Sequence, residues 1–172
     1  MMLKGRALVT GGAGFLGAHM CERMLDEGFE VLCLDNFLTG SLKNISRLSE
    51  QLRFNYANTD ISTPFNVEGP VSLVIHLASP ASPVHYQKHP IQTLMVGSIG
   101  TYHALEVARC NSATFLLASS SEAGQLSCRA FTELTAITTR ISIMSDARVW
   151  EIILSMARLL LGGKCRQFTF TA

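Results

Sequence analysis

The fold is decided by the stretch Val9-Thr10-Gly11-Gly12-Ala13-Gly14-Phe15-Leu16-Gly17. It holds glycines at Gly12-x-Gly14-x-x-Gly17 spacing, and a second set begins at Gly11. An apolar run at 7–9 precedes it, and apolar residues at helical spacing follow it over 15–27. Glycine suits such a turn because the backbone bends sharply and must lie close to a bound phosphate. The pattern predicts a strand, a tight turn and a helix whose N-terminus binds phosphate.

Asp35 closes the second apolar run, 18 residues after Gly17. A carboxylate at that place in a βαβ unit binds ribose hydroxyls, and it repels a 2′-phosphate. Residue 36 is Asn rather than Arg. The sequence therefore predicts NAD rather than NADP as the cofactor; the alternative is a glycine-rich turn with an incidental aspartate. The predicted cofactor-binding residues of this unit are Gly11, Gly12, Ala13, Gly14, Phe15, Leu16, Gly17, Asp35 and Asn36.

Short apolar runs alternate with longer amphipathic ones through the first two thirds of the chain. We expect strands at 7–9, 30–34, 53–56, 71–77 and 113–118, and helices at 15–27 and 91–109. The prolines of 80–83 are expected to form a loop, and Pro90 to open the second long helix. This order predicts an α/β protein with a Rossmann-type, doubly wound parallel sheet covered by helices on both faces.

Three further segments fall where strands end. Asp60-Ile61 follows the third strand, where the carboxylate is expected to lie near the adenine amino group or to cap its own loop. Leu77-Ala78-Ser79 follows the fourth strand and is predicted to contact the cofactor at the sheet edge. We interpret His76, just before it, as a hydrogen-bonded strand-end histidine rather than a catalyst.

Composition excludes several classes. The 172 residues are 48% hydrophobic and carry a net charge of +1, which excludes a disordered or collagen-like chain and gives no field that would attract nucleic acid or an anionic membrane. No signal peptide or membrane span is recognisable, so we expect a soluble cytoplasmic protein. The five scattered cysteines are expected to be free thiols, and no metal site is predicted.

With the glycine motif, Asp35-Asn36-Phe37, residues 76–79 and Ser119-Ser120-Ser121-Glu122 in this order, the chain resembles the extended short-chain dehydrogenase/reductase family, the NAD-dependent epimerases and dehydratases. Within it, the resemblance is to the UDP-glucuronate decarboxylases (UDP-xylose synthases). That narrower likeness rests on Leu77-Ala78-Ser79-Pro80-Ala81-Ser82-Pro83, Tyr86, Pro90-Ile91-Gln92-Thr93-Leu94 and Gly100-Thr101. It covers about residues 5–122.

The resemblance implies a lyase that uses NAD as a recycled redox agent. UDP-glucuronate would be oxidised at the sugar C4 hydroxyl, its carboxylate would leave as carbon dioxide, and reduction of the ketone would give UDP-xylose. Ser120 matches the family's catalytic Ser/Thr and Glu122 its glutamate, and Pro80 and Tyr86 would lie near the substrate. Another nucleotide-sugar 4-epimerase or 4,6-dehydratase, or a non-catalytic NAD-binding isoform, remains an alternative. The resemblance also implies that the full-length enzymes form homodimers.

The pattern breaks after Glu122. The family's Val-Tyr-Gly appears as Ala123-Gly124, Gly97 replaces an asparagine, and no Tyr-x-x-x-Lys follows, because the last tyrosine is Tyr102. All prolines, histidines and tyrosines lie in residues 1–122. We therefore expect a partial NAD-binding domain over 1–122 and an unrelated tail over 123–172, from a shifted frame, an alternative exon or an annotation artefact. The expected fold is a truncated one that lacks the substrate domain and leaves an unpaired sheet edge.

Overall fold

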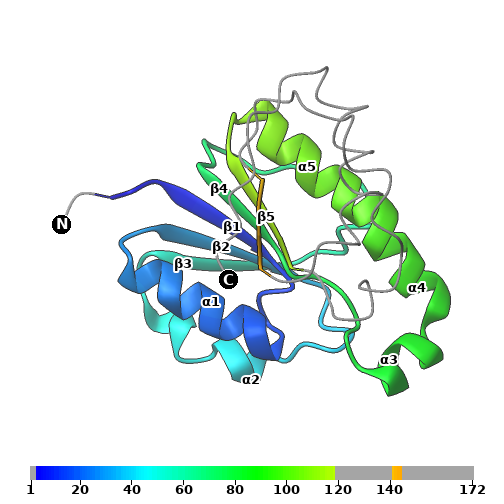
Figure 1. Ribbon diagram of the computed structural model, residues 1–172. Coiled ribbons are helices and arrows are strands. Elements are labelled where there is room, and N and C mark those ends of the chain that lie inside the picture. The colour runs from blue at the N-terminus through cyan, green and yellow to red at the C-terminus, as the bar shows by residue number, and fades with distance from the viewer. Residues whose placement is uncertain (1–2, 119–140, 145–172) are drawn as a thin grey trace.

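The computed structural model describes residues 3–118 and 141–144, and their core is one parallel sheet (Figure 1). Its strands are β1 (Arg6–Thr10), β2 (Glu30–Asp35), β3 (Phe54–Asn58), β4 (Leu73–His76), β5 (Thr114–Ala118) and β6 (Ile141–Met144). They lie in the order β3-β2-β1-β4-β5-β6, and every neighbouring pair is parallel. The chain runs outward from β1 to β3 and then returns to β4, so the order reverses beside β1. That reversal places a crevice at the C-terminal ends of β1 and β4.

The helices cover both faces of the sheet. They are α1 (Phe15–Asp26), α2 (Leu42–Ile45), α3 (Pro83–Lys88), α4 (Pro90–Met95) and α5 (Thr101–Cys110), with a 3₁₀ turn η1 (Leu48–Glu50) and a π-helical turn η2 (Val96–Gly100). Figure 1 shows α1 and α2 on one face and α5 on the other. The expected doubly wound α/β sheet is confirmed.

Alternating side chains of the strands build two cores. Leu8, Val74 and Phe115 pack with α5, whereas Val9 and Ile75 pack on the opposite face with α1. The side chains at 7–9 are all fully buried. A central parallel strand is covered on both sides, which is why the strands appear in the sequence as short unbroken apolar runs.

The structure differs from the sequence prediction at several elements. The run 91–109, predicted as one helix, is divided into α4, η2 and α5, and the short helix α2 was not predicted. Directly after the loop predicted at 80–83, residues 83–88 form the short helix α3, because Pro83 occupies a first-turn position where its missing N–H costs nothing. Residues 141–144, expected to belong to an unrelated tail, pair with β5 as β6. In the described residues, β5 therefore has β4 on one side and β6 on the other. The remainder of the proposed tail lies outside the described residues, and so do the predicted catalytic residues Ser120 and Glu122, which precede the tail.

Among the described residues, no helix has the length and apolar character needed to cross a membrane. In the same part of the chain, no three His, Cys, Asp or Glu side chains come together as metal ligands. Cys21, Cys33 and Cys110 are free thiols.

Candidate functional site: a dinucleotide pocket at the ends of β1 and β4

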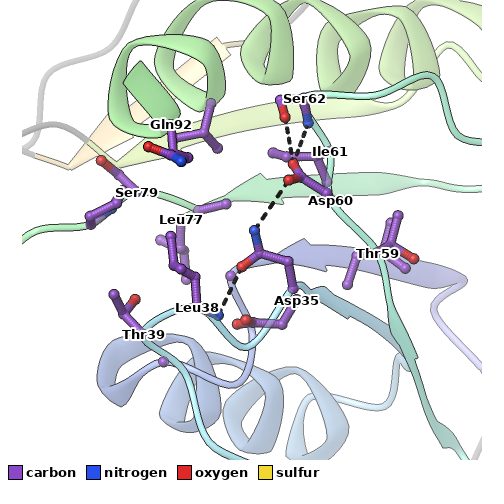
Figure 2. A pocket seen from close by; sticks show the side chains of 17 residues that line it. Asp35, Leu38, Thr39, Thr59, Asp60, Ile61, Ser62, Leu77, Ser79 and Gln92 are labelled. Carbon is purple, nitrogen blue, oxygen red and sulfur yellow. Dashed lines mark hydrogen bonds between the residues drawn. The ribbon is translucent and has the colours of Figure 1, made fainter. Parts of the chain in front are cut away.

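A pocket opens at the C-terminal ends of β1, β2 and β4 (Figure 2). Asp35 and Asp60 lie toward one end of it, and Ser79 and Gln92 toward the other. Most of the predicted site residues in the described part of the chain share this cavity. Its full lining is Gly11, Gly14, Leu34, Asp35, Asn36, Leu38, Thr39, Thr59, Asp60, Ile61, Ser62, Leu77, Ala78, Ser79, Pro80, Gln92 and Val96.

The glycine-rich turn is shaped by close backbone contacts. Gly11 has a φ of 71°, and a Cβ there would lie 2.7 Å from the backbone of Ala78. A Cβ on Gly17 would overlap the Gly11 carbonyl oxygen, so the first turn of α1 packs directly on the loop. Both positions therefore require glycine for the fold alone.

Gly14 is different. Its Cβ would meet only the Gly11 carbonyl oxygen, at 3.2 Å, and Gly14 lines the pocket. The missing side chain thus leaves room in the cavity rather than room for neighbouring protein. Gly14 is also the N-cap of α1, which has no side-chain cap and no acidic residue in its first turn. The free N–H groups and the helix dipole at this end can bind an anion that lies in the pocket.

Gly12 and Ala13 face the protein interior. A Cβ on Gly12 would lie 2.5 Å from the Cys33 sulfur and 3.1 Å from that of Cys21. The hydrogen bond between these thiols, with their burial, raises the pKa of Cys21, so it stays protonated. The two buried cysteine side chains form a floor under the turn.

Asp35 holds the turn in place. Its Oδ2 accepts the Ala13 N–H at 2.9 Å, and its Oδ1 accepts the Phe37 N–H at 2.8 Å. Asn44 and Ser41 both donate to the Ala13 carbonyl oxygen, at 2.8 and 3.0 Å. Each carboxylate oxygen has a second lone pair. Asp35 can therefore accept ribose hydroxyls while it fixes the loop.

Asp60 caps its own turn at the rim of the pocket. The Ser62 hydroxyl and N–H donate to Asp60 Oδ1 at 2.6 and 2.9 Å, and Asn36 Nδ2 lies 3.4 Å from Oδ2. The Ser62 hydroxyl bond is the main reason that the pKa of Asp60 falls below its usual range. Of the two interpretations of Asp60, loop capping is confirmed, and its place in the pocket leaves adenine contact a proposal.

His76 is buried beneath the pocket. Its Nδ1 lies 2.7 Å from Thr10 Oγ1 and its Nε2 lies 3.0 Å from Thr101 Oγ1. Burial lowers its pKa from 6.5 to about 4, so the imidazole is neutral near pH 7. The interpretation of His76 as a satisfied strand-end histidine is confirmed.

The remaining predicted residues do not all reach the cavity. Phe15 and Leu16 project outward from the first turn of α1, 77% and 68% exposed. Tyr86 lies half-buried on α3 and does not line the pocket. Several lining residues were missed by the sequence interpretation, although most directly follow or precede motif residues: Leu34, Leu38, Thr39, Thr59, Ser62, Gln92 and Val96. Gln92 belongs to a segment that carries the family resemblance, but nothing in the sequence placed it or Val96 at the pocket, because both come from the helical run after β4.

The sheet order, the glycine-rich turn and the carboxylate at the end of β2 define the class: a Rossmann-type α/β domain. The family model described as GDP-mannose 4,6 dehydratase matches residues 8–142, and the chain belongs to that family. This match ends at residue 142, and the curated relatives align over 117 residues, a length that agrees with the resemblance expected over about residues 5–122.

Curated relatives agree with the resemblance found in the sequence. The chain is 42% identical over 117 residues to UDP-glucuronic acid decarboxylase 1 of Arabidopsis thaliana, covering 68% of this chain and 26% of that protein. It is 43% identical to UDP-glucuronic acid decarboxylase 1 of Danio rerio, with 68% and 28% covered. The chain thus spans little more than a quarter of these relatives.

Solved structures share the fold. The UDP-glucose 4-epimerase of Thermus thermophilus in complex with NAD superposes with a TM-score of 0.61 at 25% identity, covering 93% of this chain and 53% of that one. A UDP-galactose 4-epimerase gives a TM-score of 0.62 at 22% identity, with 90% and 50% covered.

Proposed function

We propose that this chain is the NAD-binding part of a nucleotide-sugar-modifying enzyme of the UDP-glucuronate decarboxylase type. The observation that carries the proposal is one pocket that joins the uncapped N-terminus of α1, Gly14 and Asp35. The relatives named UDP-glucuronic acid decarboxylase support the substrate class.

Successive parts of the pocket would hold successive parts of a dinucleotide. The N-terminus of α1 and the cavity beside Gly14 would hold the pyrophosphate, Asp35 the adenosine ribose, and Asp60 and Ile61 the adenine. Leu77, Ala78, Ser79 and Pro80 would form the wall beside the nicotinamide. Both ionisable residues that line the described pocket are acidic, which disfavours a 2′-phosphate and supports NAD over NADP.

Bound NAD would supply a hydride acceptor for the sugar C4 hydroxyl and return the hydride after decarboxylation. Chain residues would orient the reacting groups: Ser120 would hydrogen-bond the C4 oxygen and Glu122 would assist at the sugar, as the family pattern implies. Pro80, which lines the pocket, would shape the wall beside the sugar. Tyr86 lies on α3 and does not line the pocket, so it would contact the sugar from outside this lining.

The first test is cofactor binding by the full 172-residue chain, measured by calorimetry. NAD is expected to bind more tightly than NADP. Gly14→Val should lower NAD affinity at least about tenfold by filling the cavity, and Asp35→Ala should lower it similarly by removing a charged acceptor. Glu50→Ala, which removes an exposed acid outside the pocket, is the matched control and should bind as the wild type does. Unchanged affinity in both pocket variants would contradict the proposal.

The second test is product analysis with UDP-glucuronate and NAD. The 172 residues contain no Tyr-x-x-x-Lys to act as the family's base. We therefore expect this chain alone to give no product, as a non-catalytic NAD-binding isoform would. UDP-xylose with carbon dioxide would show that it is active as it stands, whereas a C4 epimer would favour the epimerase alternative.

A further inference from the structure

A chain of three hydrogen bonds runs through the interior directly beneath the pocket. It joins Thr10 Oγ1 to His76 Nδ1 at 2.7 Å, His76 Nε2 to Thr101 Oγ1 at 3.0 Å, and Thr101 Oγ1 to the Gly97 carbonyl oxygen at 2.9 Å. Thr10, His76 and Thr101 are each at least 97% buried. With Asp35, they are the buried polar side chains of the described core. Buried polar groups of this kind are costly unless each one is paired.

The direction of every bond in the chain follows from one end. The Gly97 carbonyl can only accept, so the single hydroxyl proton of Thr101 is donated to it. Thr101 Oγ1 must then accept from His76, and Nε2 therefore carries the ring proton. In a neutral imidazole Nδ1 is then an acceptor, and it receives the Thr10 hydroxyl proton. One tautomer of His76 satisfies all three bonds.

Three of the four groups in this network, all except Thr101, are next to a residue that lines the pocket. Thr10 precedes Gly11, His76 precedes Leu77, and Gly97 follows Val96. The three walls come from β1 with its glycine-rich turn, from the end of β4, and from η2. The backbones of the glycine-rich turn and of the segment after β4 are already packed tightly, because a Cβ on Gly11 would overlap Ala78. A change in the length of the hydrogen-bond chain would therefore shift one wall against another.

We propose that His76, held as its Nε2–H tautomer between Thr10 and Thr101, is a positioning residue that sets the spacing of the glycine-rich turn and η2 for the dinucleotide. This inference rests on the proposed NAD site. His76 does not line the pocket and would act only through its neighbours. The bond from Thr101 to the Gly97 carbonyl oxygen also ties the network to the π-helical turn η2.

The tautomer is tested first, without any variant and without cofactor. Long-range proton–nitrogen NMR of the full chain, with His76 assigned by its loss in His76→Gln, should show a protonated Nε2 and a bare Nδ1 between pH 6 and 8. A protonated Nδ1 would overturn the proposal.

The second test separates positioning from general stability. Thr101→Val keeps the side-chain shape but leaves the imidazole N–H without an acceptor, and should weaken NAD binding about tenfold. Thr101→Ser keeps the hydroxyl and should restore affinity to within about twofold of wild type. Val31→Ala removes methyl groups from the buried strand β2, outside the pocket lining, and should lower stability while leaving the NAD affinity of the folded protein unchanged.

The outcomes of this second test are distinct. Equal NAD affinities for Thr101→Val and Thr101→Ser would overturn the positioning role while leaving the NAD site standing. Absence of NAD binding by the wild type would instead overturn the proposed function, and the positioning role with it. Loss of affinity in Val31→Ala as large as in Thr101→Val would show that the network acts only through stability, against the proposal.

Discussion

At the scale of single residues, the pocket depends on side chains that serve the fold and the ligand at once. Asp35 accepts two backbone N–H groups and keeps lone pairs for a ribose, and Asp60 caps a turn at the rim. Gly14 contributes by the space it leaves, whereas Gly11 and Gly17 are required by backbone contacts. Substitution of Gly14 is therefore expected to fill the pocket, whereas substitution of Gly11 or Gly17 is expected to disturb the fold.

His76 predicts how stability depends on pH. Its pKa is about 4 in the fold and 6.5 when exposed, because burial disfavours the charged ring. Between these values the unfolded chain binds a proton that the folded chain does not, so stability should fall as pH decreases from about 6.5 to about 4. The full loss is roughly 3 kcal/mol.

Urea unfolding at pH 7.5, 6 and 5 measures this slope. The lowered pKa values of Asp60 and Glu27 act at lower pH, below the usual carboxylate range, and so do not produce it. His76→Gln should remove most of the dependence between pH 7.5 and 5. A wild-type free energy of unfolding that is the same at pH 7.5 and 5 would show that the ring is not held neutral.

At the scale of elements, the helical run after β4 is the least regular part of the described fold. It consists of α3, α4, η2 and α5 in succession, with Pro83 and Pro90 opening the first two. The π-helical turn falls where Val96 reaches the pocket and Thr101 bonds the Gly97 carbonyl. The irregular turn η2 is therefore the part of this helical run where Val96 forms a wall of the pocket.

Two glycines in η2 predict opposite effects of alanine. A Cβ on Gly97 would meet nothing within 4 Å, so Gly97→Ala should raise the free energy of unfolding by about 0.5 to 1 kcal/mol. A Cβ on Gly100 would lie 3.1 Å from Ile61 and 3.3 Å from Val96, so Gly100→Ala should not stabilise. Urea unfolding of the two variants provides the comparison, and a gain in Gly100→Ala equal to that in Gly97→Ala would contradict the packing argument.

At the scale of the whole molecule, the described residues form a three-layer α/β unit that corresponds to a fraction of its relatives. The matched segment is 26% to 34% of the decarboxylases found by comparison. The family match continues to residue 142 and β6 pairs with β5, so the sheet does not stop at the compositional change near residue 123. The proposed tail origin stays a hypothesis for residues outside the described part.

Much of this architecture could be predicted because its signals are local. Parallel strands buried on both faces are unbroken apolar runs, and the glycine-rich turn requires its residue type through backbone contacts alone. Those two facts suffice for β1, β2, β4 and β5, for α1, and for the placing of Asp35 opposite the turn; β3 lies at the sheet edge, is mostly exposed and is not such a run. The helix α3 was missed because prolines are typical of both loops and first helical turns, and β6 because its segment has no clear period.

The rest depended on how distant segments meet. Gln92 and Val96 line the pocket only because the helical run after β4 crosses the end of the sheet, and Thr10, His76 and Thr101 meet across 91 residues of chain. The hydrophobic periodicity of the sequence cannot predict such contacts, since it depends only on residues that are near one another in the chain. Within the described residues, local sequence thus specified the central strands, α1 and the glycine-rich turn, whereas the packed sheet established the pocket's far wall and the proton on His76, because both arise from long-range contacts.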